Sequence, residues 1–215
     1  MTVTYSWGIG MKALAATFLL TSLALTGCAV TVPGGPPTAS TAPSPPSGAK
    51  TYAGLDPAGI EQIKTSRTAI FDMKFGTLTK ESVGLEDGTN QAPDVLMSDG
   101  VMELKIEAPT GLIRAETDRL RLNGMNSGPE FREITYFLKT ESLKDFIALI
   151  RDGVDRYGIP SESAEDWIES VSSRPEDKSD FALAPGTSTG LRVQYDLRYD
   201  GSKDVQVIIV HVHPV

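Results

Sequence analysis

Apolar and polar residues alternate strictly over residues 191–198, near the C-terminal end of the chain. Apolar side chains stand at Leu191, Val193, Tyr195 and Leu197, and a second apolar segment, rich in Val and Ile, covers residues 205–212. Such a period of two predicts half-buried β-strands. Gly201-Ser202 between them suits a two-residue turn, which predicts a β-hairpin with Arg192 opposite His211.

Other segments show the same period of two. Strands are expected at Ala69–Gly76, Val101–Ile106 and Phe131–Lys139. Leu112–Leu122 is ambiguous between strand and helix, and the alternation around Arg121 favours a strand.

Helical spacing occurs in three places. Ser142 precedes a stripe of apolar residues with a spacing of three or four that ends at Gly158, which predicts a helix over 142–157. A second helix is expected over Ser163–Ser172, and a short one after Asp56-Pro57. The pattern therefore predicts an α+β domain: an antiparallel sheet of five or six strands with the two longer helices packed on one face.

The N-terminal apolar run has the length of a secretory signal. It covers Ala13–Leu25 and follows Lys12, which supplies the positive charge expected before such a run. Residues 1–10 carry no charge, so translation is expected to start at Met11. The run is too short to span a bilayer, which takes about 20 apolar residues.

Leu25-Thr26-Gly27-Cys28 at the end of this run resembles the lipobox of bacterial lipoproteins. The resemblance implies that residues 1–27 are a signal peptide and that Cys28 receives a diacylglyceryl group. Two acyl chains give stable membrane anchoring, whereas one chain does not. The implied location is the extracytoplasmic face of the cell membrane.

Residues 28–50 differ sharply in composition from the rest. Residues 29–50 contain six Pro, three Gly, three Ser, three Thr and four Ala, with Lys50 as the single charge. Such a segment cannot bury a core, so a disordered tether is expected. A stalk of this kind follows the lipobox in many lipoproteins of high-GC Gram-positive bacteria. The globular domain is then residues 51–215, whose helix-rich centre and C-terminal hairpin are loosely similar to uncharacterised actinobacterial lipoproteins.

Composition excludes several classes of protein. A net charge of −8 argues against nucleic-acid binding, which needs a basic surface. A single cysteine excludes an internal disulfide and a Cys-based structural zinc site.

The two histidines, His211 and His213, stand at i, i+2 and share one side of a predicted strand. Such a pair can supply two metal ligands. The predicted register shows no third ligand and places the cation of Arg192 beside His211. We therefore expect a solvated strand face, without a metal or other cofactor.

Two further candidates have a functional and a structural interpretation. Ser188 stands in a Gly-x-Ser-x-Gly sequence, followed by Asp196 and the histidines. A hydrolase nucleophile elbow needs a strand before the serine and a helix after it. Here Pro185 precedes and a strand follows, which favours a loop. Trp167 could stack on a ligand, but its place on a helical stripe favours the core.

These observations predict a non-enzymatic binding module anchored in the cell envelope, with a protein, lipid or glycan as partner. A lipid or glycolipid carrier with an apolar cavity is the alternative. A small serine hydrolase using Ser188 with His211 or His213 is the third possibility.

Overall fold

The structure is a computed structural model that describes residues 51–215, apart from residues 87, 90–91 and 125–127. The predicted signal peptide, the lipobox with Cys28 and the tether lie outside the described residues. Among the described residues, none of the helices has the length and apolar character needed to cross a membrane.

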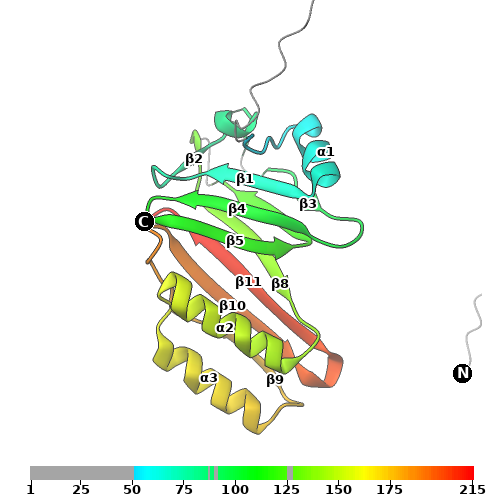
Figure 1. Cartoon of the computed structure of the whole chain (residues 1–215), viewed down its shortest axis with the longest axis vertical. Helices are drawn as coiled ribbons and strands as arrows, with labels where there is room; N and C mark the ends of the chain where they lie inside the picture. Colours follow the sequence, from blue (N-terminus) through cyan, green and yellow to red (C-terminus); the bar gives the residue numbers. More distant parts are fainter. Residues whose placement is uncertain (1–50, 87, 90–91, 125–127) are drawn as a thin grey trace, which may run out of the picture. The chain divides into compact units, whose positions relative to one another are not determined.

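A six-stranded antiparallel sheet forms the centre of the fold (Figure 1). Its strands, in spatial order, are β3 (Val95–Leu96), β6 (Arg119–Asn123), β8 (Glu133–Lys139), β11 (Val205–His213), β10 (Arg192–Asp200) and β9 (Lys178–Ala182). The strands expected from the alternation at 101–106, 112–122 and 131–139 are present, but the ambiguous segment makes two strands instead of one. β9 was missed because its residues are mostly exposed and carry no apolar alternation.

A smaller three-stranded sheet lies against the large one. It consists of β1 (Thr68–Asp72), β4 (Met102–Ala108) and β5 (Gly111–Thr117), with β1 and β4 parallel. Two further short strands, β2 (Leu78–Thr79) and β7 (Glu130–Phe131), pair with each other. The predicted strand over 69–76 ends early: a turn closes from Met73 to Gly76, and Phe75 is 95% exposed.

The helices form where the sequence predicts them. α1 (Pro57–Ser66) begins at Asp56, whose carboxylate accepts a hydrogen bond from the Gly59 N–H at 2.7 Å. α2 (Leu143–Tyr157) is capped by Ser142 and ends at Gly158, which adopts a φ of 73°. α3 is Ser161–Ser173. Short 3-10 turns occupy Glu81–Val83 and Gly201–Lys203.

One face of the six-stranded sheet is covered. In Figure 1, α2 lies in front of β10 and β11. The buried side chains of α2, α3 and the three-stranded sheet join those of the large sheet in a single core. Among them, Phe146 of α2 contacts Trp167 of α3 and Tyr199 of β10. The α+β architecture with two helices on one face of an antiparallel sheet is confirmed.

The opposite face of the large sheet is the open face. Its side chains are mostly half-exposed or exposed; on the three central strands they come from Glu133, Thr135, Phe137 and Lys139 of β8, Val207, Ile209, His211 and His213 of β11, and Arg192, Gln194, Asp196 and Arg198 of β10. Alternation thus gives each strand one covered and one open side.

The C-terminal hairpin forms, but its register differs from the predicted one by two residues. His211 lies opposite Gln194, and Arg192 lies opposite His213. The turn uses Gly201–Lys203 followed by Asp204, which has a φ of 53°, instead of Gly201-Ser202 alone. A shift of two preserves the side of every residue, so the faces are as predicted and only the pairings are wrong.

Candidate functional site

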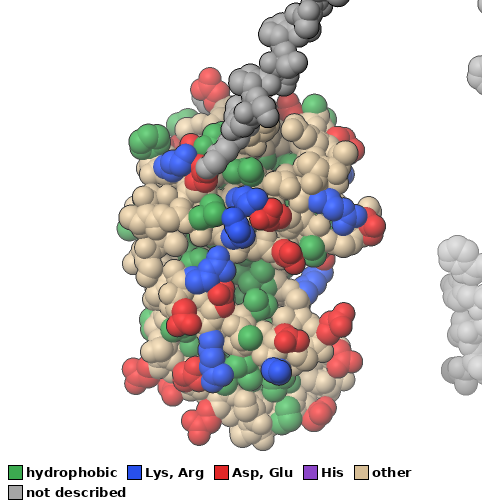
Figure 2. Space-filling view, in the orientation of Figure 1, with side chains coloured by type: hydrophobic (Ala, Val, Ile, Leu, Met, Phe, Trp, Pro, Cys, Tyr) green, Lys and Arg blue, Asp and Glu red, His purple; other side chains and the backbone are tan. Residues whose placement is uncertain are grey.

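A cleft of about 530 Å³ lies between β5 and α2, above β8 and β10 of the large sheet. Figure 2 shows a hollow across the middle of the molecule, with hydrophobic side chains at its bottom and both kinds of charge around it. Its lining comes from four parts of the chain that are far apart in the sequence: Arg114–Glu116; Tyr136 with Leu138, Lys139 and Thr140; a row of α2 residues from Asp145 to Tyr157; and Tyr195. The volume is in the usual range for small-molecule sites.

Three tyrosines meet at the bottom of the cleft. Tyr136, Tyr157 and Tyr195 are each nearly completely buried. The rings of Tyr157 and Tyr195 meet edge to face at 6.2 Å, and the hydroxyls of Tyr136 and Tyr157 are hydrogen-bonded. Burial raises the pKa of all three hydroxyls. They therefore stay protonated and can donate as well as accept hydrogen bonds.

Arg156 is held in place at the mouth of the cleft. Its guanidinium pairs with Asp152 at 2.9 Å and donates to the carbonyl of Arg114 at 3.3 Å. It also stacks over the ring of Tyr157, 5.2 Å from the centroid. A cation fixed by three contacts loses little side-chain entropy when a ligand binds.

The predicted serine site is not assembled. Ser188 lies in the loop before β10, where its N–H donates to the Tyr157 carbonyl at the end of α2. α2 packs on the covered face, whereas His211 is on the open face. The loop runs into a strand, so the strand–serine–helix order of a nucleophile elbow is missing.

Trp167 is a core residue. Its side chain is 5% exposed, and its Nε1–H donates to the Ser179 hydroxyl at 3.0 Å. A partner inside the fold satisfies the single polar atom of the indole, and the rings of Phe146 and Tyr199 pack against it.

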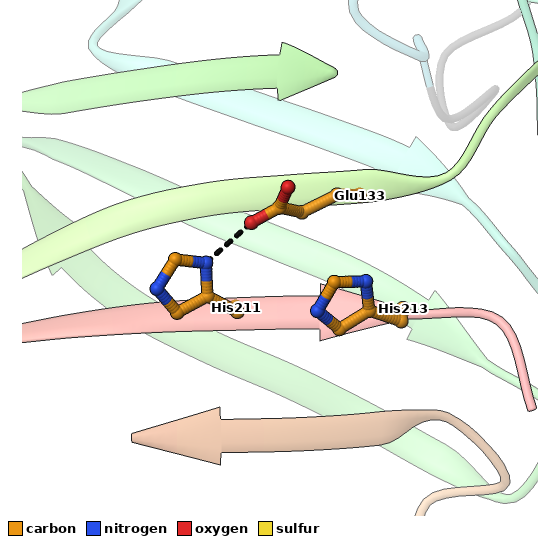
Figure 3. A group of neighbouring side chains, drawn as sticks. All are labelled: Glu133, His211 and His213. Carbon is orange, nitrogen blue, oxygen red and sulfur yellow. Dashed lines mark hydrogen bonds and ion pairs between the residues drawn. The ribbon is translucent and has the colours of Figure 1, made fainter. Parts of the chain in front are cut away.

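The histidines meet a third side chain that the sequence did not indicate. In Figure 3, Glu133 reaches from β8 toward His211, and the two imidazoles stand side by side along β11. The rings are nearly parallel, with centroids 6.3 Å apart. The Glu133 carboxylate and His211 Nδ1 are in hydrogen-bond contact. One ligand atom from each of the three residues lies within 4.8 Å of the other two.

Hydrogen bonds fix the carboxylate of Glu133. Its oxygens accept from the Thr135 hydroxyl at 2.8 Å and from the Asn123 amide at 3.1 Å. The adjacent His211 ring, together with these donors, holds the pKa of Glu133 at about 2, although partial burial opposes this. The group is therefore a carboxylate at neutral pH.

Sequence reasoning missed Glu133 because it stands 78 positions before His211. Alternation assigns both residues to a strand face, but it does not reveal that β8 is the neighbour of β11. The same limit applies to the three tyrosines, which come from β8, α2 and β10. Comparisons of the chain with protein-family models, curated proteins and solved structures gave no match.

Proposed function

We propose that the chain is a lipid-anchored protein of the cell envelope that binds, without converting, a hydroxyl-rich ligand such as the end of a glycan. The anchor is the diacylglyceryl group on Cys28 that the lipobox implies. The binding site is the cleft between β5 and α2. The tyrosine-floored cleft is the observation that carries the proposal.

The lining of the cleft favours hydroxyl groups as ligands. Each hydroxyl donates and accepts, so it needs both kinds of partner. Tyr157 supplies a hydroxyl that can act as either partner. The walls supply guanidinium donors from Arg114 and Arg156 and carboxylate acceptors from Glu116 and Asp152. Ion pairing of Arg156 with Asp152 offsets charge within the cleft, so a neutral ligand meets no unbalanced field.

A fatty-acyl ligand fits this lining less well. Acyl chains make no hydrogen bonds, so they would bury the charged wall residues and the tyrosine hydroxyls without compensation. The lipid-carrier alternative is therefore the weaker proposal. Binding without conversion is favoured because Ser188 and His211 lie on opposite sides of the sheet.

Blocking the cleft tests the binding proposal. Ala148 of α2 lines it, so Ala148→Trp fills the mouth with an indole. The full chain in mild detergent is titrated by calorimetry with neutral oligosaccharides and, separately, with a fluorescent fatty acid. We expect oligosaccharide binding that Ala148→Trp abolishes. Ser172→Trp, on the exposed side of α3, is the matched control and should bind normally.

A smaller change tests the role of the tyrosine hydroxyl. Tyr157→Phe keeps the ring and should weaken binding about fivefold to tenfold, the value of one hydrogen bond. Binding that survives Ala148→Trp, or binding of the fatty acid alone, contradicts the proposal.

The anchor has an independent test. Cys28→Ala removes both the acyl acceptor and the cleavage site, so labelling with an alkyne fatty acid should disappear and the precursor should stay unprocessed. Wild-type protein that takes up no label refutes the anchor but leaves the cleft proposal standing.

A further inference from the structure

We propose that Glu133, His211 and His213 form a binding site for a divalent first-row transition metal, with Zn²⁺ as the representative ion. The site lies on the open face of the large sheet, away from the cleft. Two imidazoles and one carboxylate are ligands that zinc accepts in proteins.

Strand pairing brings the three side chains together. His211 and His213 point to the same side of β11 because they are two residues apart. β11 pairs with β8 so that His211 faces Thr135, and the same register brings Glu133 level with His213. The backbone positions of all three ligands are therefore set by the two central strands of a sheet and not by a loop.

The distances suit closure around an ion. Zinc with ligand bonds of about 2.0–2.2 Å in a tetrahedron separates its ligand atoms by about 3.3 Å. The candidate ligand atoms lie within 4.8 Å of one another before any ion is present. The Glu133 and His211 atoms are in direct contact, so an ion would move this pair apart and replace the hydrogen bond between them. All three side chains are partly exposed, so small rotations of the side chains can make these adjustments without moving the backbone.

Outer contacts hold two ligands in a metal-binding orientation. His213 Nδ1 lies 3.1 Å from the Arg132 carbonyl oxygen, which can only accept, so Nδ1 carries the proton. The lone pair is then on Nε2, which faces along the strand toward His211 (Figure 3). Thr135 and Asn123 orient the Glu133 carboxylate in the same way. Metal-binding histidines and carboxylates in proteins generally have such partners.

Two features of the site affect its affinity for a cation and the number of its ligands. Arg192 lies opposite His213 and weakens the attraction for a cation, but its side chain is exposed and can turn into solvent. Three protein ligands leave the fourth position of a tetrahedral ion open to water or to a donor from another molecule. The site therefore has the form of an open metal site and not of a closed structural one.

The full chain in mild detergent, freed of metal and titrated with Zn²⁺ at pH 7.5, tests the proposal. We expect one equivalent of zinc, and Glu133→Gln and His213→Gln should each weaken binding by at least about tenfold. Glu165→Gln, which removes a carboxylate paired with Arg151 on the helical side, is the matched control and should leave affinity unchanged. Every variant retains Cys28, so any contribution from that residue is common to all.

Two readouts separate a built site from loose binding. The chain has only two histidines, so imidazole NMR signals report on this site alone. Zinc should shift both sets of signals and should raise the thermal midpoint of the wild type but not of His213→Gln, because only binding to the native state stabilises it. A shift of one histidine alone, unchanged zinc affinity in Glu133→Gln, or no binding at millimolar zinc overturns the proposal.

Discussion

The two faces of the six-stranded sheet are built from the same strands but differ in how far their side chains are buried. On the covered face, Val193, Tyr195 and Val210 are at most 1% exposed and belong to the core. On the open face, their sequence neighbours Gln194, Ile209 and His211 remain half-exposed. The energy of folding is therefore concentrated on one side, and the other is free to carry chemistry.

The two candidate sites lie on different faces of the sheet. The cleft opens onto the covered face, where burial keeps the tyrosine hydroxyls protonated. The histidine cluster stands on the open face, where a carboxylate stays charged and water can reach it. Burial suits recognition of a neutral ligand, and partial exposure suits capture of an ion.

The largest expected difference in stability between the two faces is at two phenylalanines, Phe146 and Phe137. Phe146→Ala on the covered face should lower the free energy of unfolding by about 3–5 kcal/mol, because it leaves a cavity beside Trp167. Phe137→Ala on the open face should cost only about 1 kcal/mol, from partial burial and the Arg119 side chain over its ring. Urea unfolding of the two variants measures both values. Similar losses would show that the open face is covered in solution.

This contrast also separates what the sequence could predict from what it could not. The two long helices, the faces of the hairpin and the fold class follow from local periodicity and from caps such as Ser142 and Gly158. Pairing between distant strands does not, because alternation is the same whichever neighbour a strand has. The parallel pair of β1 with β4, and the approach of Glu133 to His211, were therefore unpredictable.

A glycine on α2 tests how tightly the covered face is packed. A Cβ at Gly153 would lie 2.6 Å from Cε2 of Tyr195. Alanine normally stabilises a helix by about 1 kcal/mol relative to glycine, but overpacking costs about 1–3 kcal/mol. Gly153→Ala should therefore destabilise the fold by about 1 kcal/mol in urea unfolding. Ser172→Ala on exposed helix surface is the control; a gain in both variants would contradict close packing at Tyr195.

An ion cluster beside the open face provides a test that depends on pH. The Asp94 carboxylate accepts from Arg121 Nε at 2.6 Å and from Arg119 Nε at 3.1 Å. The hydrogen bond from Arg121 is the main reason why the pKa of Asp94 lies well below its ordinary value. Burial opposes this lowering, and the hydrogen bond and charge of Arg119 add to it. At neutral pH, Asp94→Asn should cost about 1 kcal/mol.

The sign of the pH dependence follows from the lowered pKa. The stabilisation is complete above the unfolded pKa of about 3.9 and is lost as the pH falls through the lower folded value. The difference between wild type and Asp94→Asn should thus be constant from pH 7 to 5 and shrink in acid. Asp99→Asn, at an exposed pair with Arg67, should show almost no effect at any pH. A difference that grows in acid would exclude the ion cluster as its source.

The smallest effect is expected at the turn between β10 and β11, which sets the residues that pair across the hairpin. Asp204 has a φ of 53°, a left-handed conformation that costs an ordinary residue more than glycine. Asp204→Gly should therefore stabilise the protein by about 0.5 kcal/mol.

If the turn were the two-residue Gly201-Ser202, Asp204 would stand inside a strand, and the same change would destabilise the protein by a similar amount. Ser202→Gly is the control, because Ser202 has no positive φ and donates to Asp200 at 2.7 Å. Stabilisation by Asp204→Gly but not by Ser202→Gly thus supports the register in which His211 lies opposite Gln194, with Arg192 two pairs farther along, opposite His213. The opposite signs would return Arg192 to His211 and place a fixed cation against the histidine that contacts Glu133.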